Sequence, residues 1–165
     1  LDTLDTAWQL GHRQVGVALQ AALRRSDSDL AHLIDMGVPV RLVKGAYKEP
    51  ASAAYQQKAE VDEAFLRLMT RLLEAGTRPA IATHDPAMIT ATRARAEALG
   101  LTADRFEFQM LYGIRRDLQA SLADEGLPVR IYVPYGTDWY PYFVRRLAER
   151  PANLWFFVSN LVRRA

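Results

Sequence analysis

Residues 35–44 read Asp35-Met-Gly-Val-Pro-Val-Arg-Leu-Val-Lys44 and join the end of an expected helix to a short apolar strand. Gly37 can adopt the left-handed conformation that ends a helix, while Pro39 stops the helix from continuing and suits the first position of a strand. The arrangement recurs in Glu74-Ala-Gly-Thr-Arg-Pro79 and Asp124-Glu-Gly-Leu-Pro128, and without the proline in Ala98-Leu-Gly100. This repeated junction predicts helices that alternate with strands.

Each strand expected from the apolar pattern is followed by a helical pattern. The strands are expected at 15–20, 40–44, 80–83, 105–109 and 129–132, and the helices at 28–36, 51–75, 86–99, 114–124 and 140–149. One more helix is expected at 152–164, and the first dozen residues resemble the end of another. Successive strand–helix units predict an α/β fold with a parallel sheet and right-handed crossovers. No linker interrupts the series, so residues 1–165 are expected to form a single domain.

Composition excludes several classes of function. Half of the 165 residues are apolar and the formal net charge is +2, which is typical of a globular domain. Basic residues occur in pairs rather than long blocks, so a nucleic-acid partner is not expected. The chain has no cysteine, and His12, His32 and His84 lack zinc-ligand spacing. A redox function would therefore need a bound cofactor. No apolar run or leader pattern indicates a membrane span or a signal peptide, so a cytoplasmic location is expected.

Polar residues gather where the expected strands end. In parallel α/β folds the carboxyl ends of the strands carry the ligands, because loops there meet helix N-termini whose free N–H groups favour anions. The sequence therefore predicts a ligand site at this edge of the sheet. The strand-end residues are Gln20, Lys44-Gly-Ala-Tyr47, Thr83-His-Asp85, Gln109 and Tyr132.

Single members of this set have alternative interpretations. Lys44-Gly45 resembles a phosphate-contacting turn but lacks the glycine spacing of the common nucleotide-binding loops. Asp85-Pro86 fits a helix start, with Asp85 as N-cap and proline in the first helical position. His84 is a candidate general base, although no serine or threonine beside it is an evident nucleophile. Arg41 lies inside an apolar strand, where it is either half-exposed or faces a ligand or an acid.

Residues 129–150 carry a strand, an aromatic turn and a helix with the adjacent arginines Arg145 and Arg146. An arginine fork matches both oxygens of a carboxylate, and nearby tyrosines can enclose an apolar body. Glu149 lies one turn beyond Arg145, so a solvated face with a surface ion pair explains the same spacing.

Four motifs in this order resemble those of proline dehydrogenases, especially the compact monofunctional bacterial members. They are Arg41-Leu-Val-Lys-Gly-Ala-Tyr47, Ala82-Thr-His-Asp85, Phe106-Glu-Phe-Gln109 and the stretch from Tyr132 to Arg146. The resemblance extends from about Val15 onward. It implies a TIM-type (β/α) barrel of which this chain supplies about five βα units plus a C-terminal helix. It also implies FAD as cofactor, L-proline as substrate, 1-pyrroline-5-carboxylate as product and a membrane quinone as electron acceptor. A peripheral position at the inner membrane is therefore the alternative to a purely cytoplasmic location.

The same resemblance assigns roles to residues of this chain. Arg41 would lie near flavin N5 as the catalytic cation, so that it stabilises negative charge on the reduced ring. Arg145 and Arg146 would clamp the proline carboxylate, and Tyr132 would pack against the proline ring. The residues implied to hold FAD are Gln20, Lys44, Gly45, Ala46, Thr83, His84, Gln109 and Glu149.

The match corresponds to roughly strands four to eight of such a barrel, which typically needs ~250 residues. The earlier strands of the family contribute a lysine and an aspartate that have no counterpart here. Because an unclosed sheet exposes its edges, a complementary N-terminal segment or a homo-oligomer is expected as partner. Two further interpretations remain open: a fragment that binds flavin or carboxylate without turnover, and a structural half-barrel that assembles with another chain.

Overall fold

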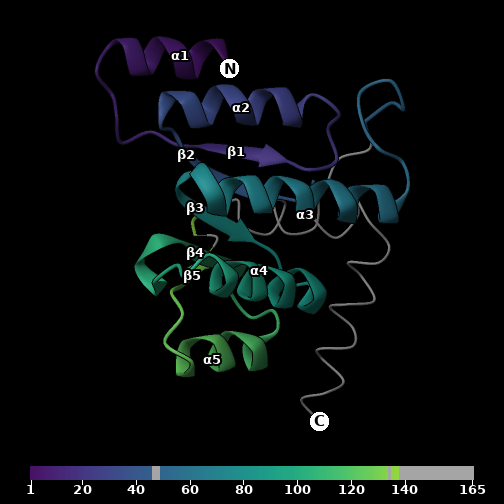
Figure 1. Cartoon of the computed structure of the whole chain (residues 1–165), viewed down its shortest axis with the longest axis vertical. Helices are drawn as coiled ribbons and strands as arrows, with labels where there is room; N and C mark the ends of the chain where they lie inside the picture. The colour runs from purple at the N-terminus through teal and green to yellow at the C-terminus, as the bar shows by residue number, and fades with distance from the viewer. Residues whose placement is uncertain (46–48, 134, 138–165) are drawn as a thin grey trace.

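The computed structural model describes residues 1–45, 49–133 and 135–137, and they form a parallel sheet flanked by helices (Figure 1). The strands closely follow the expected ones; the first helix precedes the first strand, and the other helices of the described residues lie between strands. The strands are β1 (Val17–Gln20), β2 (Pro39–Val43), β3 (Thr77–Ala82), β4 (Glu107–Leu111) and β5 (Val129–Tyr132). The helices are α1 (Asp2–Gln9), α2 (Ser26–Met36), α3 (Lys58–Ala75), α4 (Pro86–Ala98), the 3-10 turn η1 (Ala103–Arg105) and α5 (Arg116–Asp124).

The sheet has the order β1-β2-β3-β4-β5, and every neighbouring pair is parallel. Figure 1 shows α2, α3, α4 and α5 one below another on the same side of the sheet. A doubly wound sheet would reverse its strand order at one point and carry helices on both faces. Sequential parallel strands with helices on one face are the arrangement of a (β/α) barrel wall. The α/β barrel-type fold is therefore confirmed.

The strand register separates an apolar face from a polar one. Leu19, Leu42, Ile81 and Phe108 lie side by side across the sheet, and all four are buried beneath the helices. Since side chains alternate along a strand, the intervening residues point to the other face. Residues on that open face are mostly half-buried or exposed. They include Ala18, Gln20, Arg41, Ala82, Glu107, Gln109, Arg130 and Tyr132.

Helix α3 begins later than the sequence predicts. Residues 51–57 are not helical, and the helix starts at Lys58 after a capping box between Gln57 and Glu60. The segment before it is held instead by an isolated bridge between Ala54 and Leu23 and by a hydrogen bond of 3.0 Å from Arg24 Nε to the carbonyl of Ala51. The helical expectation for 51–57 is wrong because these tertiary contacts outweigh local helix propensity.

The glycine junctions are confirmed in part. Gly37 ends α2 in the left-handed conformation with φ 75°, and Pro39 begins β2 as expected. Gly76 is different, since its φ is −77° and the left-handed prediction is wrong there. A Cβ on Gly76 would lie 2.6 Å from the carbonyl oxygen of Leu72. Close backbone approach, rather than a positive φ, therefore requires glycine at this junction.

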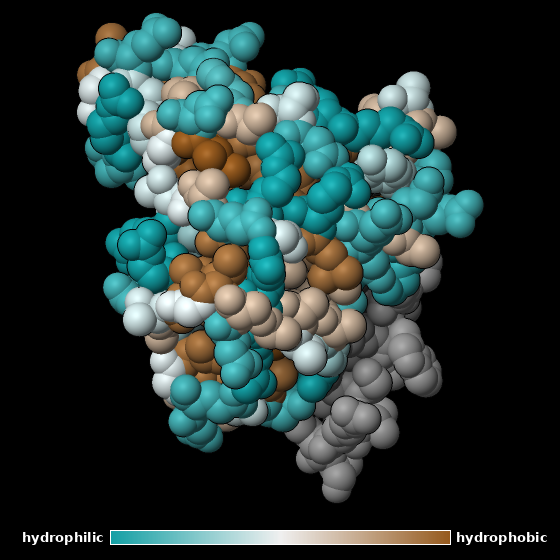
Figure 2. All heavy atoms as spheres, viewed as in Figure 1, coloured by the Kyte–Doolittle hydropathy of each residue, from teal (hydrophilic) through white to brown (hydrophobic). Residues whose placement is uncertain are grey.

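The helix-covered face is mainly hydrophilic, with smaller apolar areas between polar side chains (Figure 2). Within the described residues, no helix is long and apolar enough to cross a membrane. The helices expected at 140–149 and 152–164 lie outside the described residues.

Candidate functional site

A row of polar side chains crosses the open face from β2 to β5. Arg41 Nε donates to Gln109 Oε1 at 2.7 Å, and Gln109 Nε2 donates to Glu107 Oε1 at 2.6 Å. Arg130 completes the row, because its Nε and Nη2 donate to the two oxygens of Glu107 at 2.7 and 2.8 Å. Arg41 is half-buried and faces this row rather than solvent alone. We call Arg41, Gln109, Glu107 and Arg130 the polar row.

The polar row lines an open cavity of about 520 Å³. Gly16, Pro39 and Pro128 also line it, so it lies toward the amino ends of the strands. Ligands of parallel α/β folds bind at the opposite, carboxyl edge. The cavity therefore lies on the amino-end side of the edge at which a ligand is expected.

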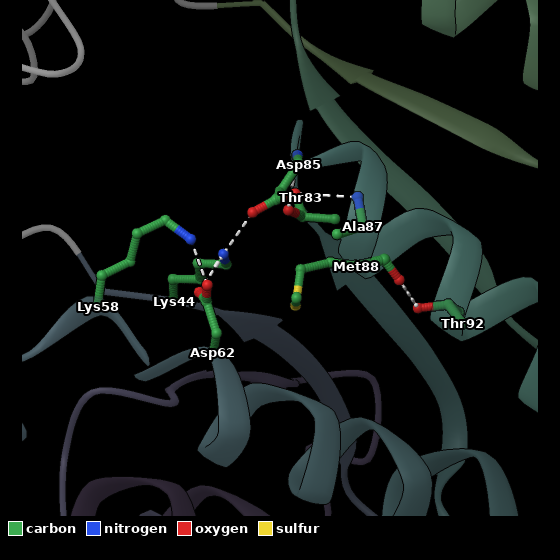
Figure 3. A network of polar contacts seen from close by, with 8 residues as sticks. All are labelled: Lys44, Lys58, Asp62, Thr83, Asp85, Ala87, Met88 and Thr92. Atoms are coloured by element: carbon green, nitrogen blue, oxygen red, sulfur yellow. Dashed lines mark hydrogen bonds and ion pairs between the residues drawn. The ribbon is translucent and has the colours of Figure 1, made fainter. Parts of the chain in front are cut away.

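Lys44 follows β2 at the carboxyl edge and is held by two acids (Figure 3). Its Nζ donates to Asp85 at 2.7 Å and to Asp62 of α3 at short range, and Asp62 also accepts from Lys58. Asp85 in turn accepts from the backbone N–H of Ala87 at 3.0 Å, which confirms it as the N-cap of α4. The expected helix start, with Pro86 in the first helical position, is confirmed with it.

Electrostatics keep both acids of this network charged. Burial raises the pKa of each carboxyl, but hydrogen bonds outweigh it: those from Lys44 and Lys58 to Asp62, and those from Lys44 and the Ala87 backbone to Asp85. Both pKa values therefore lie below their ordinary range. The positive charge of Lys44 is balanced by these carboxylates. Its contacts join the end of β2 to α3 and to the start of α4.

The backbone of Gly45 lies close to the side chain of Gln20. Its φ is 106°, and a Cβ there would lie 3.0 Å from Gln20 Oε1 and 3.1 Å from the Ala22 side chain. Parallel pairing continues beyond the strands, because Ala22 donates its N–H to the Lys44 carbonyl at 2.9 Å. Glycine is needed here for both its conformation and its lack of a side chain.

His84 is a neutral hydrogen-bonding group in this structure. Its Nε2 accepts the backbone N–H of Leu111 at 2.8 Å, which places the ring proton of the neutral imidazole on Nδ1. Burial, with contributions from Arg115 and Arg41, lowers the pKa of His84 to about 4. The lone pair that a general base would use is already engaged. The neighbouring Thr83 is buried and accepts the N–H of Asp85 at 3.1 Å.

Aromatic side chains lie exposed where β4 and β5 end. Tyr132 is 49% exposed, Tyr112 63% and Tyr135 100%, and Val133 between them is 56% exposed. These exposed side chains are available for contact with a ligand or with another segment. The remaining site candidates, Ala46, Arg145, Arg146 and Glu149, lie outside the described residues.

The fold and the site define a barrel-type α/β protein with polar side chains at the carboxyl ends of its parallel strands. A sequence profile of proline dehydrogenase matches residues 2–158. This chain belongs to the proline dehydrogenase family. It is 50% identical over 155 residues to a proline dehydrogenase of Deinococcus radiodurans and 45% identical over 153 residues to proline dehydrogenase 2 of Bacillus subtilis strain 168. These matches cover 94% and 93% of this chain but 50% of each relative, so the chain spans about half the length of these curated relatives.

Solved structures of proline utilization A proteins are also similar to this chain. Proline utilization A (PutA) of Bdellovibrio bacteriovorus, inactivated by N-propargylglycine, superposes with a TM-score of 0.74 at 35% identity, covering 80% of this chain and 16% of that one. A PutA mutant of Bradyrhizobium japonicum has a TM-score of 0.71 at 28% identity, covering 80% of this chain and 16% of that one.

Sequence reasoning missed the partners of several candidates. Glu107 and Gln109 are two positions apart in one strand, so the sequence already indicated that both point to the same face of the sheet. The pairing of Glu107 with Arg130, and of Lys44 with Asp62, depends on strand register and helix packing that no local pattern contains.

Proposed function

We propose that this chain forms the carboxyl-terminal half of the barrel of an FAD-dependent proline dehydrogenase, with residues 1–165 as one partial barrel domain. The enzyme oxidises L-proline to 1-pyrroline-5-carboxylate and passes the electrons to a membrane quinone. The observation that carries the proposal is the open, polar sheet face of a family member, with Gln20, Arg41 and Gln109 on one surface. If this face only packed against an apolar core, polar side chains would not be needed on it.

The residues at the carboxyl edge fit a flavin. Gly45 allows backbone to approach closely, the Gln20 amide offers both donors and acceptors, and Arg41 supplies a cation on the same face. FAD held by these residues would supply the two-electron acceptor for oxidation of the proline C–N bond to the imine. The protein's contribution is alignment, exclusion of water and a suitable charge near the reacting ring.

The ion pairs of Lys44 change the role that we propose for this residue. Because the Nζ of Lys44 is bonded to two carboxylates, we propose that Lys44, Gly45 and Ala46 meet the cofactor through their backbone. Arg41 is the proposed catalytic cation, and Tyr132 packs against the proline ring. Arg145 and Arg146 hold the carboxylate of the substrate, while Thr83, His84, Gln109 and Glu149 complete the FAD contacts.

A complementary segment is proposed to cover the open face in the complete enzyme. The supporting observations are the exposed tyrosines beside β5 and the parallel edge strands β1 and β5, which leave backbone groups unpaired within the described sheet. A closed barrel satisfies such edges.

Flavin spectroscopy tests the proposal. The protein, alone and mixed with its complementary segment, is titrated with FAD, and the flavin absorbance is then followed on addition of L-proline. Uptake of FAD and bleaching by L-proline are expected; a protein that ignores FAD under both conditions overturns the proposal. Arg146→Lys should weaken the apparent proline affinity by about 1.5–3 kcal/mol, because a point charge cannot reproduce a bidentate fork. Arg95→Lys, in helix α4, is the matched control, because its guanidinium pairs with Glu74 and has no proposed role in substrate binding.

A further inference from the structure

The polar row has a direction that is set by its acid. An ionised carboxylate can only accept hydrogen bonds, so the amide nitrogen of Gln109 must face Glu107. The amide oxygen then faces Arg41, whose Nε can only donate. A reversed amide would place a donor against Arg41 and an oxygen against the carboxylate. One orientation of Gln109 therefore satisfies both neighbours.

Arg130 keeps this acid charged. Its two hydrogen bonds to Glu107 lower the pKa of the carboxyl, burial raises it, and the hydrogen bond from Gln109 lowers it further. The pKa of Glu107 consequently lies below its ordinary range. Arg130 itself is 66% exposed in its side chain, so the ion pair serves mainly to hold the carboxylate in place.

The sheet leaves room for the contact between Arg41 and Gln109. These residues lie on β2 and β4, which β3 separates, so their backbones are about 10 Å apart. The β3 residues that face them on the same surface are Ala80, paired with Arg41, and Ala82, paired with Gln109. Their small side chains let the guanidinium extend across the middle strand.

We propose that Glu107 is a positioning residue that orients Arg41 through the carboxamide of Gln109. Arg41 is thereby held by its Nε, and the described residues place no other hydrogen bond on its guanidinium. The catalytic consequence, a cation fixed toward the reacting ring, rests on the proposed function. The orientation itself depends only on the polar row.

Solvent exchange of the Arg41 Nε–H, observed by nitrogen-15 NMR, tests the orientation without any cofactor. The resonance is assigned by its loss in Arg41→Lys. Glu107→Gln should accelerate exchange about tenfold, the effect of losing a charge-assisted hydrogen bond. Gln109→Leu should do the same. In the double variant the rate should equal that of Gln109→Leu alone, since Glu107 acts through Gln109.

A matched control removes a different acid. Glu125→Gln breaks an ion pair with Arg93 away from the polar row and should leave the Arg41 signal unchanged. Unaltered exchange in Glu107→Gln overturns the proposal. So does a further acceleration when Glu107→Gln is added to Gln109→Leu, because Glu107 would then act on Arg41 directly.

The flavin-loaded protein separates this inference from the proposed function. When Arg41 is less well positioned, it stabilises the reduced flavin less. A tenfold smaller equilibrium constant for flavin reduction corresponds to a midpoint potential about 30 mV more negative for a two-electron couple. A potential that stays constant in Glu107→Gln, despite faster exchange at Arg41, would overturn the link between the polar row and the flavin. Failure to bind flavin at all would refute the proposed function, while the exchange measurement would still decide the role of Glu107.

Discussion

Lys44→Met should destabilise the folded chain far more than Lys58→Met, although both lysines contact Asp62. Lys44 donates to two acids, and the side chains of Lys44, Asp62 and Asp85 are 18%, 20% and 27% exposed. Lys58 is 78% exposed. A hydrogen bond to a charged group contributes about 1.5–3 kcal/mol when it is shielded from water, whereas an exposed i,i+4 pair contributes about 0.3–0.5 kcal/mol. The expected losses are about 3 kcal/mol for Lys44→Met and about 0.5 kcal/mol for Lys58→Met.

The pH dependence of this loss gives a second check. The folded-state pKa values of Asp62 and Asp85 lie below their ordinary range. Their pairing with Lys44 therefore stabilises the fold above an unfolded-state pKa of about 3.9, and this stability is lost as the pH falls through the folded-state values. The difference between wild type and Lys44→Met should be full near neutral pH and should shrink in acid.

Urea unfolding followed by far-UV circular dichroism, at about pH 7 and about pH 3, measures both effects. Equal losses for the two lysine variants would show that burial does not strengthen the Lys44 contacts. A loss for Lys44→Met that persists undiminished at the acid pH would show that the contacts are not electrostatic.

Three further perturbations test neighbouring parts of the structure. Asp85→Ala removes the cap on Ala87 and should cost about 1 kcal/mol more in urea unfolding than Asp85→Asn, whose amide oxygen can still accept; equal losses would exclude the cap. His84 has a pKa of about 4, below its unfolded value, so the wild type should lose up to ~3 kcal/mol as the pH falls from about 6.5 to about 4, and His84→Gln should flatten this dependence in the same titration. A slope unchanged in His84→Gln would mean that another group titrates. Gly76→Ala places a Cβ 2.6 Å from the Leu72 carbonyl oxygen, which should reduce the free energy of unfolding by ~1–3 kcal/mol and lower the thermal midpoint by several degrees. An unchanged midpoint would contradict the close approach.

The alternation of helices and strands was predictable because it depends on local chemistry. Glycine and proline at positions such as Gly37 and Pro39 end one element and begin the next whatever surrounds them. The prediction failed where surroundings matter. Gly76 is required by the nearby Leu72 carbonyl rather than by its own dihedral angle.

The candidate site was predictable as a set of residues but not as a set of contacts. Parallel strands bring their carboxyl ends together, so Gln20, Gly45 and His84 were correctly expected near one edge. The engagement of the His84 lone pair by the Leu111 N–H was not predictable, because it joins strand ends 27 positions apart in the chain. It changes the chemistry expected of that histidine.

The sequence by itself determined the order of elements, the α/β class and the edge at which polar residues gather, because strand alternation and helix caps are properties of short stretches of chain. Only the tertiary structure decided which partner each charge has. Lys44 is neutralised by acids of α3 and the β3–α4 junction, and Arg41 reaches over β3 to Gln109 because Ala80 and Ala82 are small. Both outcomes depend on strand register and helix packing, which bring together residues that are distant in the chain.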